Sequence, residues 1–245
     1  AIARIFAKQI HLTRLKNDLV ATVSHELKTP LTSMRVLVDT LLDTEQLHEP
    51  TTREYLQLIS QENTRLSRLI DNVLTFSRLE RNKLTFDFSE TQPEVVVADA
   101  VAAIGDRFRA PGCHFEVHTS PGLPLIRADR DALTTALLNL LDNAWKYSSE
   151  EKQITLRTDA RNGSVAFIVQ DNGVGLARRE TRRIFRRFYQ VDHRLSRSTG
   201  GCGLGLSIVE QIVAAHGGQV HVVSEAGAGS SFTIEVPAVK PSSTA

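Results

Sequence analysis

The stretch NLLDNAWKY at residues 139–147 decides which fold the sequence predicts. It ends a strongly apolar helix predicted over residues 129–147, and Asn139 and Asn143 lie about one helical turn apart on the same face. Asparagine is a weak helix former, so this pair indicates either a ligand site or a polar stripe on a surface helix. Amide oxygens are hard ligands that suit Mg²⁺, and Lys146 is close enough along the helix to reach a phosphate.

Short strands surround this helix in an irregular order. The sequence predicts two strands, a helix and two more strands downstream of it, and a strand, a helix and a strand upstream. Because strand and helix do not alternate as βαβ units, the pattern favours an α+β sandwich. The predicted strands are residues 83–88, 113–119, 154–159, 165–170, 219–224 and 231–236, and the other predicted helices are residues 95–108 and 204–216.

The first eighty residues follow a different period. Apolar residues recur at three- and four-residue steps to about Leu42, and near-heptad spacing from Tyr55 to Phe76 predicts a second helix. A hairpin with two narrow apolar seams cannot bury both of them, so we expect two copies to form a dimeric four-helix bundle. The expected domain boundary near residue 81 separates an all-α hairpin over 1–80 from an α+β domain over 81–240.

Composition and charge narrow the classes of function. Among the 245 residues, 29 Lys and Arg nearly balance 28 Asp and Glu, so a net charge of +1 gives no reason to expect nucleic acid or a polybasic membrane surface. Cys113 and Cys202 match no metal-ligand spacing; reduced thiols are expected, and a disulfide stays open. No stretch has the roughly 20 apolar residues of a membrane span. The chain starts inside a predicted helix, so we expect a fragment of a longer protein.

A second motif with chemical meaning is SHELKTPL at residues 24–31. His25 and Thr29 lie one helical turn apart, and Glu26 stands beside His25. Pro30 removes a helical hydrogen bond, so the helix is expected to bend there. A carboxylate that hydrogen-bonds one imidazole nitrogen makes the other nitrogen a better nucleophile, whereas a histidine beside an acidic residue is also common on ordinary helix surfaces.

Glycine-rich segments flank an arginine-rich stretch. DNGVG at residues 171–175 follows a predicted strand and places the Asp171 carboxylate where it could accept from the exocyclic amine of adenine, but it is also ordinary turn chemistry. GGCGLGLS at residues 200–207 leads into a helix, whose N-terminal N–H groups can bind phosphate. The charged stretch between residues 176 and 200 is expected to be a solvated face or a mobile lid.

These motifs, taken in order, resemble those of the sensor histidine kinase family over nearly the whole chain. Each motif alone is loose, but six of them in sequence are specific. The resemblance implies an ATP-binding domain of the histidine kinase, topoisomerase and chaperone type. The matching segments are the phosphoacceptor box at 25–30, the N box at 139–147, the first glycine box at 171–175, the F box at 185–188, the second glycine box at 201–205 and a short third glycine box at 227–232.

The resemblance implies an enzyme that uses ATP to phosphorylate its own His25 and passes the phosphoryl group to an aspartate of a response regulator. It implies that Glu26 is the acid or base beside His25. Thr29 matches the position that orients water during dephosphorylation of the regulator, so phosphatase activity is expected as well. The implied partners are a second copy and a receiver domain. The implied location is the cytoplasmic side of an inner-membrane-anchored sensor, with membrane contact only through segments missing from this fragment.

For the cofactors, the resemblance implies ATP and Mg²⁺, with the metal held by Asn143, assisted by Asn139, and with adenine read by Asp171. Many family members carry an arginine that reaches the γ-phosphate where this chain has Gln190. The resemblance leaves that charge to Arg187 or to an arginine of the lid. The other nucleotide-binding residues that it implies are Lys146, Tyr147, Gly173, Gly175, Gly201, Gly203, Leu204, Gly205 and Leu206.

Two other functions remain open at this point. One is an ATP-hydrolysing conformational machine of the wider superfamily, and the other is a dimeric scaffold that binds nucleotide without transfer. Resemblance suggests that the hydrolysing members use a glutamate at the Asn139 position to activate water. Asparagine cannot act as a base at neutral pH, so transfer to a side chain is favoured over fast hydrolysis. The stimulus, the regulator and the choice between transfer within a subunit or across the dimer are not readable from the sequence.

Overall fold

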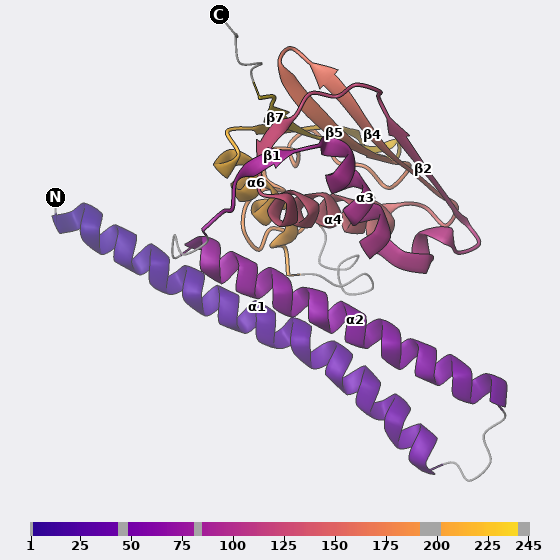
Figure 1. Ribbon diagram of the computed structural model, residues 1–245. Helices are drawn as coiled ribbons and strands as arrows, with labels where there is room; N and C mark the ends of the chain where they lie inside the picture. Colours follow the sequence, from indigo (N-terminus) through magenta and orange to yellow (C-terminus); the bar gives the residue numbers. More distant parts are fainter. Residues whose placement is uncertain (1, 44–48, 81–84, 192–201, 240–245) are drawn as a thin grey trace, which may run out of the picture.

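Two long helices form the first part of the chain. In the computed structural model, α1 spans Ile2–Asp43 and α2 spans Glu49–Glu80, and they lie side by side as a hairpin (Figure 1). The predicted hairpin is therefore confirmed. The structure describes residues 2–43, 49–80, 85–191 and 202–239, and within them it leaves out the side chains of residues 2–19, 80 and 106.

Pairing of α1 with α2 leaves many large apolar side chains exposed. Leu42 keeps 77% of its surface exposed and Val36 keeps 58%. Apolar side chains of a complete core are far less exposed than this. Pro30 is buried inside α1, which continues through it; the bend expected there stays a prediction. None of the described helices combines the length and the apolar character needed to cross a bilayer. The exposed apolar residues of the hairpin are Val20, Leu31, Val36, Val38, Leu42, Leu56, Leu58, Ile70 and Leu74.

A five-stranded sheet forms one layer of the second part. Its strand order is β2-β4-β5-β7-β6, in which β2 pairs with β4 in parallel and every other neighbouring pair is antiparallel. A separate antiparallel pair joins β1 to β3. The strands are β1 Ser89–Thr91, β2 Cys113–Thr119, β3 Ile126–Ala128, β4 Lys152–Arg161, β5 Ser164–Asp171, β6 Gln219–Glu225 and β7 Gly229–Pro237.

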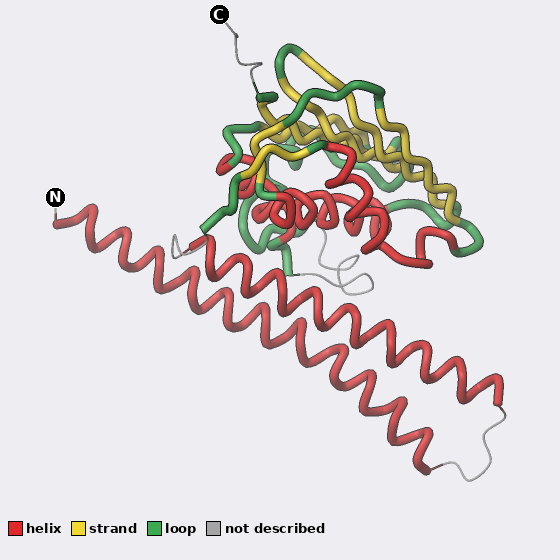
Figure 2. The backbone as a smooth tube through the Cα atoms, viewed as in Figure 1, coloured by secondary structure: helices red, strands yellow, loops and turns green. Residues whose placement is uncertain are grey.

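Three helices cover one face of this sheet (Figures 1 and 2). They are α3 (Pro93–Ile104), α4 (Arg130–Tyr147) and α6 (Gly205–Ala215). Leu137 and Leu140 of α4 are fully buried in the same core as Val169 of β5. Each fully buried aliphatic side chain stabilises the fold by about 1.5–3 kcal/mol relative to exposure. The α+β sandwich predicted from the sequence is confirmed.

The strand predicted over residues 83–88 is wrong in its described part. Residues 85–88 form no strand, and the first strand begins at Ser89. The alternation of Phe86 and Phe88 arises because both rings pack against His216, at centroid distances of 5.6 and 5.0 Å. The predicted helix over 95–108 also ends early, at Ile104, because Gly105 adopts φ +66° and a 3₁₀ turn follows over Gly105–Arg109.

Asp129 connects the segment just before β1 to the helices α4 and α6. Its carboxylate caps α4 by accepting from the Ala132 N–H at 2.9 Å, and it also accepts from the Asp87 N–H at 2.9 Å. Its own N–H donates to Nε2 of His216 at 3.0 Å, so the proton of this imidazole is on Nδ1, which donates to the Ile212 carbonyl at 2.7 Å. These hydrogen bonds hold the start of α4 against the end of α6.

Candidate functional site

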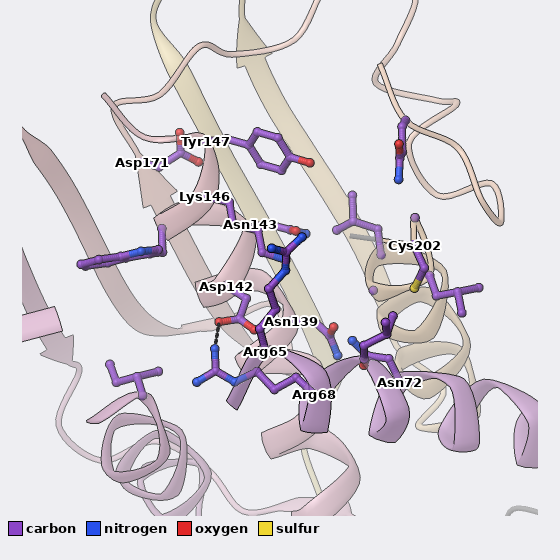
Figure 3. A pocket seen from close by; sticks show the side chains of 18 of the residues that line it. Arg65, Arg68, Asn72, Asn139, Asp142, Asn143, Lys146, Tyr147, Asp171 and Cys202 are labelled. Atoms are coloured by element: carbon purple, nitrogen blue, oxygen red, sulfur yellow. Dashed lines mark hydrogen bonds and ion pairs between the residues drawn. The ribbon is translucent and has the colours of Figure 1, made fainter. Parts of the chain in front are cut away.

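A cavity of about 1260 Å³ opens between α2, α4, the start of α6 and the end of β5. It exceeds the roughly 300–1,000 Å³ of an ordinary ligand site because it includes the space between the hairpin and the sandwich. Figure 3 shows the side chains that converge there. Among the residues predicted from the sequence, those that line the cavity are Glu26, Asn139, Asn143, Lys146, Tyr147, Asp171, Gly175, Gly203, Leu204, Gly205 and Leu206.

The last turns of α4 direct three polar side chains into the cavity. The side chains of Asn143, Lys146 and Tyr147 make no hydrogen bond or ion pair with the residues that the structure describes, so their polar side-chain atoms are available to a ligand. Burial lowers the pKa of Lys146, and the nearby Asp142 carboxylate opposes this shift. A cation that burial removes from water gains most when an anion binds beside it.

Asn139 is placed differently from Asn143. It is buried, its Nδ2 donates to the Thr135 carbonyl at 3.0 Å, and its Oδ1 faces the start of α6. A Cβ atom at Gly205 would come within 2.8 Å of Oδ1, so only glycine lets the helices approach this closely. Asn139 therefore packs against α6, whereas the side chain of Asn143 is open to a ligand in the cavity.

Asp171 ends β5 as a buried carboxylate. Its Oδ1 accepts from the N–H groups of Gly173 at 2.9 Å and Ser230 at 3.2 Å, and Oδ2 accepts no hydrogen bond from the described residues. Burial raises the pKa of Asp171, and the two N–H groups oppose the shift. A buried acceptor with an unused oxygen suits a ligand that brings its own donor.

Gly173 joins the end of β5 to the end of α4. A Cβ atom there would collide with the Tyr147 carbonyl, and the Val174 N–H donates to that carbonyl at 3.0 Å. Gly173 itself does not line the cavity. It acts on the site by holding Asp171 beside Tyr147.

The first turn of α6 has N–H groups without a side-chain cap. The helix begins at Gly205, and the residue at its N-cap position is Leu204, whose side chain cannot accept a hydrogen bond. Gly203, Leu204 and Leu206 also line the cavity. This end of the helix can therefore bind an anion. Gly201, predicted to belong to the same group, lies outside the described residues.

The hairpin supplies the opposite wall of the cavity. Pro30 and Glu26 reach it from α1, and Arg65 and Arg68 reach it from α2. The Arg68 Nη1 atom pairs with Asp142 Oδ1 at 3.2 Å, which fastens α2 to α4 (Figure 3). Arg107 pairs with the same carboxylate oxygen, and its guanidinium lies 5.5 Å from the centroid of the Trp145 ring.

His25 does not itself line this cavity, but its neighbour in α1 does. It is exposed on α1, where Thr29 Oγ1 donates to the His25 carbonyl at 3.3 Å, and neither side chain lines the cavity. The adjacent Glu26 does line it, and its charge adds to the effect of burial in raising the pKa of Tyr147. The histidine is thus one residue away from the wall that faces α4.

Arg187 lies outside the cavity. Its guanidinium stacks over the Phe76 ring of α2 at 5.3 Å, and Phe188 packs against the same ring edge-on at 5.9 Å. The arginines that do line the cavity, Arg65, Arg68 and Arg107, were missed by sequence reasoning. For Arg65 and Arg68, the sequence signal is limited to the apolar neighbours Leu66 and Leu69 in α2, which do not distinguish them from a solvated helix face.

Two models of known protein families match separate parts of the chain. The His Kinase A (phospho-acceptor) domain matches residues 15–82, and the "Histidine kinase-, DNA gyrase B-, and HSP90-like ATPase" matches residues 128–240. The sensor-like histidine kinase SenX3 of Mycolicibacterium smegmatis is 33% identical over 225 residues, which cover 91% of this chain and 57% of SenX3. The chain spans about half the length of the curated relatives it matches.

Solved structures show the same architecture. Full-length ShkA, crystallised in complex with AMPPNP, has a TM-score of 0.64 and 32% identity, covering 90% of this chain and 46% of that chain. Histidine kinase ThkA in complex with response regulator protein TrrA has a TM-score of 0.67, covering 95% of this chain and 65% of that chain. At 20% identity, the second likeness supports the fold alone.

Proposed function

Because this chain belongs to the sensor histidine kinase family, we propose that it transfers the γ-phosphoryl group of ATP to its own His25. One observation carries the proposal. A single cavity has Asp171, Asn143 and Lys146 on one side and Glu26, the neighbour of His25, on the other. A nucleotide bound along α4 would therefore point its phosphates at the helix that carries the acceptor.

Nucleotide binding is assigned to groups that the described residues leave unused. Asp171 Oδ2 would accept from the exocyclic amine of adenine, because Oδ1 is already occupied by two backbone N–H groups. The uncapped N–H groups at the start of α6 and the Lys146 ammonium would bind phosphate oxygens. The AMPPNP complex of ShkA supports an adenine nucleotide as the ligand.

The donor set of the cavity fits a magnesium ion at one position. Asn143 presents a neutral amide that bonds to no described residue, and Mg²⁺ usually takes few protein ligands besides phosphate oxygens and water. When bound, Mg²⁺ neutralises charge on the phosphates. Asn139 has its amide oxygen turned toward Gly205, so its assistance to the metal stays a prediction.

The transfer step needs His25 as a neutral nucleophile. The lone pair of one imidazole nitrogen forms the bond to the γ-phosphorus while the bond to the bridging oxygen breaks, and that electron pair leaves on ADP. The proton on the other ring nitrogen passes to the Glu26 carboxylate and then to water. Positioning and charge neutralisation supply most of the catalysis in such reactions.

The partners and the surroundings are part of the proposal. We place a helical domain over 1–80 and a catalytic domain over 81–240, and we propose that a second copy covers the exposed apolar residues of the hairpin. A response regulator would then receive the phosphoryl group from His25, which is exposed beside the cavity. This core would work on the cytoplasmic side of a membrane-anchored sensor, where ATP is available.

The experiment for this function is to incubate the chain with γ-labelled ATP and to characterise the bound label. With Mg²⁺, label is expected to stay on the protein through denaturation, to be lost in acid and to survive in alkali, because a phosphohistidine N–P bond is acid-labile. Chelation of the metal with EDTA is expected to abolish labelling. Release of free phosphate without protein-bound label would instead identify an ATP-hydrolysing machine.

The chain is also proposed to remove the phosphoryl group from the phosphorylated regulator. Thr29 lies one helical turn from His25 and is exposed, so its hydroxyl can orient a water for attack on the regulator's phosphoaspartate. Thr29→Ala is expected to remove most of this phosphatase activity and to leave autophosphorylation within about twofold of wild type. The measurement is the loss of label from a phosphorylated regulator. Unchanged phosphatase activity in the variant would remove Thr29 from this role.

A further inference from the structure

Arg65 of α2 enters the cavity from the helical domain. Figure 3 shows its side chain extending away from α2 and toward Asn143 of α4. The side chain is 34% exposed, so two thirds of its surface is already covered before any ligand binds. Its charge also opposes protonation of Lys146, which places both cations in the same part of the cavity.

The guanidinium of Arg65 has no hydrogen bond to the described residues. Among the described residues it forms an ion pair with Glu62, whose Oε2 lies 3.5 Å from Arg65 Nη1 and is itself buried with no hydrogen-bond partner in this part of the chain. A guanidinium carries five N–H donors in a fixed planar fork that matches phosphate oxygens. Arg65 is therefore held near the cavity by charge while its donors remain available.

Apart from Lys146, the other described cations that line the cavity are bonded to protein groups. Arg68 and Arg107 both pair with Asp142, and Lys152 donates to the Ser149 carbonyl at 3.1 Å. Among the described side chains that line the cavity, only Lys146 and Arg65 are cations without a hydrogen bond. Charge that develops on a transferring phosphoryl group is stabilised best by such preorganised donors.

We propose that Arg65 binds the γ-phosphate during transfer, so that the helical domain completes the phosphoryl-transfer site of the same chain. The inference rests on the proposed function. Arg65 would donate two N–H groups to γ-phosphate oxygens while the phosphorus moves from the β–γ bridging oxygen to the His25 nitrogen, and it would neither lose nor gain a proton. Gln190, which also lines the cavity, carries no charge and cannot take this role.

This assignment makes catalysis depend on the position of α2. The Arg68–Asp142 pair and the stacking of Arg187 on Phe76 hold α2 against the sandwich, and Arg65 lies about one helical turn before Arg68. A movement of α2 along or about its axis would withdraw Arg65 without disturbing Asp171. The chain could then keep its nucleotide and stop the transfer.

The test compares Arg65→Ala with Arg53→Ala in the full chain. Arg53 is an exposed arginine of the same helix and does not line the cavity, so it controls for loss of one helix charge. Arg65→Ala is expected to slow single-turnover labelling of His25 by about 10²- to 10³-fold, the usual effect of removing one preorganised donor. Its affinity for ADP, which has no γ-phosphate, is expected to match that of wild type, and Arg53→Ala is expected to keep both properties.

Two further measurements separate a phosphate contact from a domain contact. Arg65→Lys keeps a charge and is expected to recover part of the rate, and guanidinium chloride below denaturing concentration is expected to accelerate Arg65→Ala but not Arg53→Ala. Labelling of Arg65→Ala at the wild-type rate, or a loss of ADP affinity as large as the loss of rate, would overturn the inference. Failure of the proposed function would look different, because wild type itself would then carry no label on His25.

Discussion

Replacement of His25 by alanine is expected to abolish covalent labelling of the chain by γ-labelled ATP, with no change in nucleotide affinity. The expectation follows from where the residue lies. His25 is exposed and does not line the cavity, so its removal takes away the acceptor without altering Asp171, Asn143 or the start of α6. The same exposure means that the free energy of unfolding should change by no more than about 0.5 kcal/mol.

The structure offers a matched control for this variant. His118 is also exposed and also stands beside a carboxylate, with Nε2 2.9 Å from Glu116 Oε2, but it lies on an edge strand of the sandwich. His118→Ala is expected to be labelled like wild type. Label that persists on His25→Ala, measured with nucleotide affinity in the same preparation, would contradict the assignment of the acceptor.

Replacement of Asp171 by asparagine is expected to weaken ATP binding by about 10- to 150-fold, the equivalent of roughly 1.5–3 kcal/mol for a hydrogen bond to a charged group. An amide has one oxygen, and Gly173 and Ser230 already donate to one oxygen of the native carboxylate. The variant must therefore leave either these N–H groups or the adenine amine without an acceptor. Calorimetric titration with a non-hydrolysable ATP analogue measures the loss.

The pH dependence of the same titration provides a second readout. Burial raises the pKa of Asp171 above its ordinary value of 3.8, so the free site takes up a proton at a higher pH than an exposed carboxyl would. The amine of adenine needs the ionised acceptor. Affinity is therefore expected to be complete above the raised pKa and to fall as the pH drops through it.

Asp171→Asn should lose this pH dependence, because an amide does not titrate. Asp131→Asn is the matched control, since Asp131 is exposed in the first turn of α4 and does not line the cavity. It should keep both the wild-type affinity and its fall at low pH. An Asp171→Asn variant that binds ATP as tightly as wild type would show that adenine is read elsewhere.

Much of the fold could be predicted from local patterns in the sequence. The predicted strand over 113–119 coincides with β2, and the predicted helix over 129–147 is α4 with Asp129 as its cap. These elements depend on the spacing of apolar residues that are close together in the chain, so the periodicity of the sequence predicts them. The strand predicted at 83–88 failed because Phe86 and Phe88 alternate to enclose His216, and this partner lies far away in the chain.

The candidate site divides in the same way. Its polar groups on α4, at the end of β5 and at the start of α6 belong to short motifs, because turning the backbone and spacing two amides along a helix are local requirements. What the sequence determined by itself was therefore the chemistry of the wall formed by α4, the end of β5 and the start of α6, and the identity of His25 as the expected acceptor.

Only the tertiary structure decided which charges face that chemistry. Arg68 reaches Asp142 across 74 residues and Arg107 reaches it across 35, and nothing in α2 marks Arg65 as different from an arginine in water. The environment of a charge depends on which surfaces cover it, and here these surfaces meet only when the hairpin and the sandwich pack together. For the same reason only the structure shows that Arg187 stacks over the Phe76 ring, and its place beside the nucleotide stays a prediction.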